Sequence, residues 1–183
     1  NDGDGTHFTD VTESAMAGIT FNANGMGFAT GDINNDGYED FLVTFGPYPP
    51  VSMNTPYRLF MNNRQGGFVE ITEDSGVLSY EPGVLSSSAA FVDFDEDGDL
   101  DLFIGNYLKM VPLESGLVDL VDAKNHFYEN TGLDSSGIPV FIDRTDELGL
   151  GWCGGQSEWT LGLATGDYDN DGDMDLYVAN DYG

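Results

Sequence analysis

The sequence predicts an all-β fold of antiparallel strands, and two repeated patterns carry this prediction. A nine-residue pattern rich in Asp and Asn occurs three times, at residues 32–40, 93–101 and 167–175. Small apolar residues precede each copy and β-branched or aromatic residues follow it, so each copy joins two strands. A companion pattern, Phe-x-Asp/Glu-x-Thr, precedes each copy at a nearly constant distance and begins at Phe8, Phe68 and Phe141. A constant offset indicates one repeated structural unit.

The strands of this unit follow in order along the chain. The apolar runs before the loops predict first strands at 27–31, 88–92 and 162–166, and the runs after them predict second strands at 40–45, 101–106 and 175–180. Alternating segments at 57–63 and 126–131 predict third strands, which end in Asn before a Gly-containing turn, as hairpins do. The Phe patterns then supply the fourth strands. Four antiparallel strands make one blade of a β-propeller.

The repeat predicts the organisation of the chain. We expect the end of a preceding blade at 1–25, a blade at 26–85, a second blade at 86–159 with an insertion at 107–124, and the first half of a third blade at 160–183. Propellers close with about four to eight blades. About three blades therefore predict part of a larger propeller, or a subunit whose open edges a neighbouring chain covers.

Two connections differ from the repeat and receive their own predictions. Three prolines between Gly46 and Val51 predict a rigid, extended loop. In the insertion, Leu113, Leu117, Leu120 and Val121 recur at helical spacing, which predicts one short helix.

The nine-residue loops have the chemistry of calcium sites. Oxygen-bearing side chains stand at positions 1, 3, 5 and 9, and Gly at position 6 permits a sharp turn around a hard cation. An EF-hand is excluded because its position 12 needs Glu, whereas these loops have Val43, Ile104 and Val178. Asp and Gly also gather in ordinary turns, but three copies that keep the ninth Asp favour a metal. Without a cation, the clustered carboxylates would repel one another.

The loop pattern Gly-Asp-x-Asx-x-Asp-Gly-x-x-Asp-Leu resembles the FG-GAP/VCBS repeats of integrin α-chain propellers. The Phe pattern, with its following Gly-aliphatic pair, resembles secreted relatives of the cartilage acidic protein and ASPIC/UnbV type. This resemblance implies about three Ca²⁺ ions, with backbone carbonyl ligands from Tyr38, Asp99 and Asp173, whose side chains are expected to face solvent. It implies side-chain ligands at Asp32, Asn34, Asp36, Asp40, Asp93, Asp95, Asp97, Asp101, Asp167, Asp169, Asp171 and Asp175.

Composition limits the partners and the compartment. The formal net charge is -28, from 33 Asp and Glu against 5 Lys and Arg, which disfavours nucleic acid and anionic membrane surfaces. No apolar run reaches the ~18–20 residues of a membrane span, so we expect no membrane insertion.

Cys153 is the only cysteine, which excludes a disulfide within the chain. Oxygen-rich loops of this kind fill where free calcium is near millimolar, so the expected location is extracellular, secreted or at the cell surface.

These features predict a calcium-binding extracellular scaffold or adhesion module that mediates protein or glycan interaction. Two alternatives are a subunit of an extracellular filament, built from further copies of the chain, and a non-catalytic part of a polysaccharide-active enzyme. We expect no enzyme activity from the chain itself, because its clustered acids are assigned as ligands and no Gly-x-Ser-x-Gly motif occurs. Trp152 and Trp159 are interpreted as core residues or as a carbohydrate platform.

Overall fold

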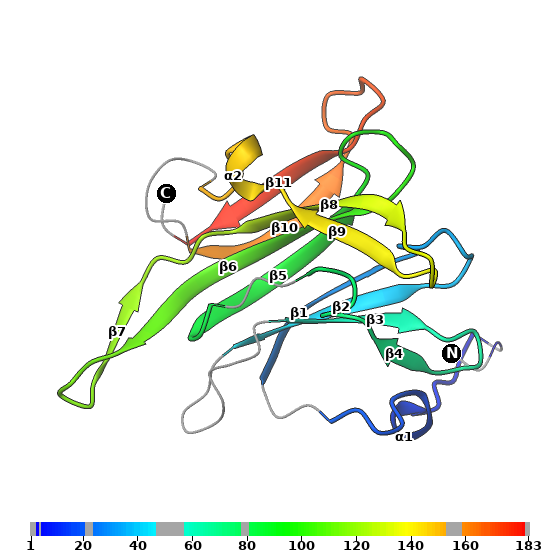
Figure 1. The fold of residues 1–183 in the computed structure, drawn as a ribbon, viewed down its shortest axis with the longest axis horizontal. Coiled ribbons are helices and arrows are strands. Elements are labelled where there is room, and N and C mark those ends of the chain that lie inside the picture. The colour runs from blue at the N-terminus through cyan, green and yellow to red at the C-terminus, as the bar shows by residue number, and fades with distance from the viewer. Residues whose placement is uncertain are drawn as a thin grey trace.

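A computed structural model of the chain describes residues 3, 5–20, 24–46, 57–77, 81–152 and 159–181. These residues form three antiparallel sheets and two single-turn helices, α1 (Thr12–Ala15) and α2 (Thr145–Leu148) (Figure 1). The prediction of an all-β, antiparallel fold is confirmed. Among the described residues, no helix has the length and apolar character needed to cross a bilayer.

The first two sheets share one strand order. The first sheet has the order β1-β2-β3-β4, with β1 (Asn24–Gly31), β2 (Asp40–Gly46), β3 (Tyr57–Asn62) and β4 (Phe68–Glu70). The second has the order β5-β6-β8-β9, with β5 (Val84–Val92), β6 (Asp101–Pro112), β8 (His126–Leu133) and β9 (Pro139–Asp143). The third consists of β10 (Thr160–Gly166) and β11 (Asp175–Asn180). Each nine-residue loop therefore connects the first two strands of a sheet.

The helix predicted in the insertion is wrong. Strand β6 runs on to Pro112, and β7 (Val118–Val121) returns along it from a turn in which Gly116 has a φ of 80°. The resulting β6–β7 hairpin projects from the body of the molecule in Figure 1. Leu113, Leu117 and Leu120 stay exposed, so their helical spacing does not mark a buried helix face. Strand pairing decides the structure of this segment instead.

The first Phe pattern does not form a strand. Residues 7–11 have no regular structure, and the Phe8 side chain is 82% exposed. The equivalent patterns at Phe68 and Phe141 form β4 and β9, which pair with β3 and β8. No described strand lies beside residues 7–11 to supply such a ladder, and an isolated extended segment has no partner for its backbone groups. Of the predicted loop at 46–51, only Gly46 lies within the described residues, where it ends β2.

The main core lies between the first and second sheets. It consists of Ile33, Leu42, Tyr57, Leu59, Ile71, Val77, Leu102, Ile104, Tyr128 and Phe141. The hydroxyl oxygens of Tyr57 and Tyr128 lie 2.8 Å apart inside this core and link the two sheets. The first strands of successive sheets are neighbours, since β5 contacts both β1 and β10. This stacking places the three loops along one side of the molecule, on the right in Figure 1.

Gly27 marks a close approach between the first two sheets, and we expect Gly27→Ala to destabilise the protein. A Cβ atom there would lie 2.5 Å from the carbonyl oxygen of Ser87 and 2.8 Å from Cα of Ser88. Because backbone would have to shift, the expected loss in the free energy of unfolding is about 1–3 kcal/mol. Gly162 occupies the same position relative to the third loop, with nothing within 4 Å of a Cβ atom, and is the matched control. Similar urea midpoints for Gly27→Ala and Gly162→Ala would contradict this account.

Candidate metal centre

The three loops share one internal hydrogen-bond pattern. The first aspartate accepts a hydrogen bond from the amide of the loop glycine, in the pairs Asp32–Gly37 (2.7 Å), Asp93–Gly98 (3.1 Å) and Asp167–Gly172 (3.2 Å). The aspartate at position 5 accepts one from the amide at position 7, in the pairs Asp36–Tyr38 (2.9 Å), Asp97–Asp99 (2.9 Å) and Asp171–Asp173 (3.3 Å). The backbone path of the loop is thus held by its own acidic side chains.

Two residues in each loop adopt a left-handed backbone. Position 4 is Asn35, Glu96 or Asn170, with φ of 54°, 59° and 60°, and position 6 is a glycine. Asn tolerates this conformation better than Glu, because its short polar side chain forms local hydrogen bonds. The left-handed turns bring positions 1, 3 and 9 back toward one another.

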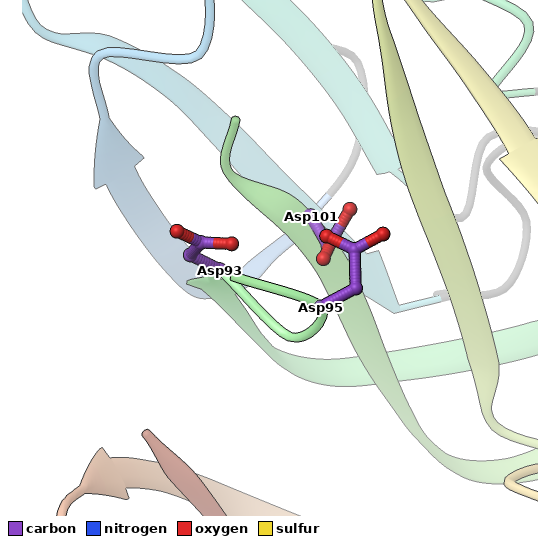
Figure 2. A group of neighbouring side chains, drawn as sticks. All are labelled: Asp93, Asp95 and Asp101. Atoms are coloured by element: carbon purple, nitrogen blue, oxygen red, sulfur yellow. The ribbon is translucent and has the colours of Figure 1, made fainter. Parts of the chain in front are cut away.

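The structure gathers some of the predicted ligands and leaves others apart. Carboxylate oxygens of Asp93, Asp95 and Asp101 all lie within 4.8 Å of one another, and Figure 2 shows that they come from the second loop and the start of β6. Asp167, Asp169 and Asp175 form the same group in the third loop. The position-5 residues, Asp97 and Asp171, stand outside these groups. The first loop has Asn34 at position 3, so an amide oxygen replaces one carboxylate.

The aspartate at position 9 is buried in the first two loops. Asp40 and Asp101 are 0% and 1% exposed, and burial raises the pKa of each to about 6. Backbone N–H groups partly offset this burial: Ile33 and Asn62 donate to Asp40, and Phe94 and Asn130 donate to Asp101. Neighbouring carboxylates raise both pKa values further. A nearby cation would reverse this electrostatic penalty.

Two buried oxygens of the loops have no hydrogen-bond partner among the described residues, Oδ1 of Asn34 and Oδ1 of Asp93. Buried polar atoms almost always have a partner, so each exception needs an explanation. Both atoms belong to residues that the sequence assigns to cation binding, at position 3 of the first loop and position 1 of the second. Their chemistry fits a hard cation, which binds amide and carboxylate oxygens.

An asparagine near the end of the third strand was missed as part of the site. Asn62 and Asn130 donate their backbone N–H groups to Asp40 and Asp101, at 2.7 Å and 2.8 Å. The side chain of Asn130 also donates to the carbonyl of Ile33, at 3.0 Å, and so ties the second sheet to the first loop. The sequence signal was present, because both segments predicted as third strands have Asn just before the Gly-containing turn.

Neighbouring loops also contact each other. The side chain of Asn35 donates to Oδ1 of Asp99 (2.7 Å) and to the carbonyl of Gly98 (3.2 Å). The Asp99 side chain, expected to point to solvent, is only partly exposed and also lies against the first loop. Between the second and third loops, like charges interact instead. A hydrogen bond and the charge of Asp171 raise the pKa of Asp173 to about 6, and Glu96 adds to the effect.

Only the first loop has a basic partner among the ion pairs of the described residues. Nε of Arg64 lies 2.7 Å from Oδ2 of Asp36. Burial acts to raise the pKa of Asp36, but hydrogen bonds from Arg64, the amide of Tyr38 and the side chain of Asn34 hold it below its usual value. This contact was also missed, since Arg64 lies outside the nine-residue pattern.

Comparison with known proteins gives a weak relationship. The chain is 27% identical over 180 residues to cartilage acidic protein 1 of Xenopus tropicalis, and the match covers 98% of this chain. It covers 24% of the relative, so the chain spans about a quarter of the length of the curated relative it matches. No protein-family model matches the chain.

Proposed function

We propose that this chain is a calcium-binding scaffold or adhesion module built from propeller blades, in which calcium fixes the loops between the first two strands. The observation that carries this proposal is the same loop geometry formed three times around carboxylates, of which Asp40 and Asp101 are buried and have no basic partner among the ion pairs of the described residues. Bound calcium would supply positive charge and ligand positions for these oxygens. The side chains at positions 1, 3, 5 and 9 and the carbonyl at position 7 would hold it, with about three ions in total.

The strand order of the sheets supports the blade interpretation. The first sheet is a four-stranded antiparallel meander, and the second has the same four-strand path with β7 added beside β6. This path has the order of a propeller blade, and the first strands of the two sheets lie side by side. The loops then share one side, which leaves other surfaces and the projecting β6–β7 hairpin for a partner. We propose a protein or glycan partner, since the charge of -28 opposes nucleic acid.

An extracellular location follows from the calcium proposal. Loops of this ligand type suit compartments in which free calcium is near millimolar. The match to a relative named cartilage acidic protein supports the proposal, because cartilage consists largely of extracellular matrix.

Calorimetric titration with calcium tests the proposed function. We expect about three ions per chain, with magnesium a poor substitute because it requires a tighter octahedron and releases water reluctantly. A control titration into protein unfolded in urea separates site binding from general attraction to acidic residues. Equal, weak heats for folded and unfolded protein would refute the proposal.

Substitutions at Asp97 and Asp99 test the ligand register in the second loop. Asp97→Ala removes a proposed side-chain ligand and is expected to weaken calcium binding at the second loop at least tenfold. Asp99→Ala keeps the backbone carbonyl, and is expected to lose only the hydrogen bond from Asn35 and a screened charge. Calorimetry on both variants decides, and equal losses would show that the assigned register is wrong.

We further propose that the chain has no catalytic activity of its own, because its clustered acids serve as ligands. Assays on acidic and neutral polysaccharides provide the test. Cleavage that survives replacement of Asp93 and Asp167 by Ala would contradict this proposal.

The open edge of β11 favours a second candidate function, assembly with further copies of the chain. In the described residues β11 pairs only with β10, whereas β2 and β6 each pair on both sides. An unpaired edge is a template for another strand. Light scattering in calcium and in chelator tests this candidate: a particle of constant monomer mass at all concentrations would remove it.

A further inference from the structure

We propose that Arg64 is a built-in competitor of calcium at the first loop, so that this loop binds calcium more weakly than the second and fills after it. This inference rests on the proposed function and concerns the affinity of one of its sites. It arises from the pairing of Arg64 with a residue that the ion needs.

The contact is made to a carboxylate that water scarcely reaches. Nε of Arg64 lies 2.7 Å from Oδ2 of Asp36, and the Asp36 side chain is 5% exposed. The side chain of Asn34 donates to the same oxygen, at 3.1 Å. Asp36 at position 5 therefore already has a cationic partner and an amide partner.

The backbone of the hairpin turn holds Arg64 in place. Its N–H donates to Oδ1 of Asn62 (2.9 Å), and the N–H of Asn62 donates to Oδ1 of Asp40 (2.7 Å). Arg64 has a φ of 57°, a conformation that side-chain-bearing residues seldom adopt. The turn that presents the guanidinium is thus connected directly to the aspartate at position 9 of the loop.

The second sheet repeats this turn without the arginine. The N–H of Gly132 donates to Oδ1 of Asn130 (3.2 Å), and the N–H of Asn130 donates to Oδ1 of Asp101 (2.8 Å). Gly132 therefore occupies the position of Arg64, and its φ of 95° is also left-handed. The described basic residues near this sheet pair elsewhere: Lys109 with Glu81, Lys124 with Asp146, and Arg144 with Glu129 and Glu147.

The two loops consequently differ in charge. The first has aspartates at positions 1, 5 and 9, Asn34 and Tyr38 between them, and the guanidinium of Arg64. The second has aspartates at positions 1, 3, 5, 7 and 9. Calcium affinity in oxygen-rich loops rises with the number of charged ligands. A divalent ion at the first loop must also approach the positive charge of Arg64, whose side chain is 59% exposed, so that this repulsion opposes binding but is partly screened by water.

Calorimetric titration of Arg64→Gln tests the inference. Gln keeps polarity and length but removes the charge, so the weakest of the calcium binding steps is expected to tighten about tenfold. The stronger steps are expected to stay within twofold. Lys109→Gln is the matched control, because it also removes one positive charge but from a residue paired with Glu81. The control should leave every dissociation constant within twofold of wild type.

Two further variants complete the test. One identifies which loop gives the tightened binding step, and the other adds an arginine to the second loop. Asp32→Ala is expected to eliminate the step that Arg64→Gln tightens, which identifies it as the first loop. Gly132→Arg is expected to weaken the second loop about tenfold. The nearest atom to a Cβ atom there is Oδ2 of Asp99, at 3.8 Å, but the φ of 95° strains any side chain, so Gly132→Arg is also expected to lower stability. Circular dichroism confirms that each variant is folded.

The outcomes separate this inference from the proposed function. If wild type binds calcium and Arg64→Gln leaves the weakest step unchanged, or weakens it, the inference is overturned while the calcium proposal stands. If Arg64→Gln and Lys109→Gln tighten all steps alike, the effect is general charge, and the inference is again overturned. If wild type binds no calcium, both fail.

Discussion

Removal of calcium is expected to lower the melting temperature of the protein by about 10–20 °C. A ligand that binds only the folded state stabilises it by about 2.7 kcal/mol per site at a hundredfold excess over Kd. If the second and third loops are filled to that degree, the total is about 5 kcal/mol, and a domain of this size gains about 2–4 °C per kcal/mol. The first loop adds less, because Arg64 already partners Asp36.

Scanning calorimetry in millimolar calcium, and again in EGTA, measures this shift. Excess calcium added back to the chelated sample should restore the higher melting temperature, which controls for effects of EGTA itself. Magnesium at the same concentration should restore only a small part of it. A melting temperature that is equal in calcium and in EGTA would contradict both the loop assignment and the proposed role of the ion.

Asp101→Ala is expected to lower the free energy of unfolding by about 1–3 kcal/mol, even in chelator. The Asp101 carboxylate is buried and accepts the N–H groups of Asn130 (2.8 Å) and Phe94 (2.9 Å). Alanine would leave the buried N–H of Asn130 without its acceptor, which costs about 1–3 kcal/mol, whereas Phe94 is exposed and water can replace the acceptor of its N–H. Relief of the raised pKa of Asp101 near neutral pH offsets only part of this cost.

Asp175→Ala is the matched control, because Asp175 holds the same position in the third loop but is only partly buried. It accepts the N–H of Tyr168, at 2.9 Å, and Tyr168 itself is exposed. The expected loss in chelator is about 1 kcal/mol or less. Urea unfolding with unchanged m-values gives both numbers. Equal losses would show that burial at position 9 does not determine its structural contribution.

The loops and strand order were predictable from sequence because their determinants are local. Alternation, turn residues and the fixed spacing of Asp and Gly act over a few residues, and they place β2, β10 and β11 close to their predicted bounds. They also place the loop-side ends of β1, β5 and β6, whose other ends extend beyond the predicted ranges. The clustering of positions 1, 3 and 9 follows from the same short-range geometry.

The predictions that were wrong or incomplete depend on partners distant in sequence. Residues 118–121 form a strand because Lys109–Pro112 extend to meet them, which the helical spacing of leucines does not reveal. The pattern at Phe8 needs a neighbouring strand that no described residue supplies. Arg64 reaches Asp36 only because the β3–β4 turn folds back over the first loop. Such contacts become visible only once the sheets are assembled.

The hydrogen bonds from Asn35 to the second loop imply that the first two loops are not independent binding sites. Asn35 lies between two ligand positions of its own loop and contacts Gly98 and Asp99 of the next. If an ion in one loop shifts these residues, thermodynamic linkage requires that each ion changes the affinity of the other by the same factor. The charge of Glu96 also raises the pKa of Asp173, so the charge of an ion in the second or third loop acts on the other loop as well. Calcium binding at successive loops along this side of the molecule is therefore expected to be coupled rather than independent.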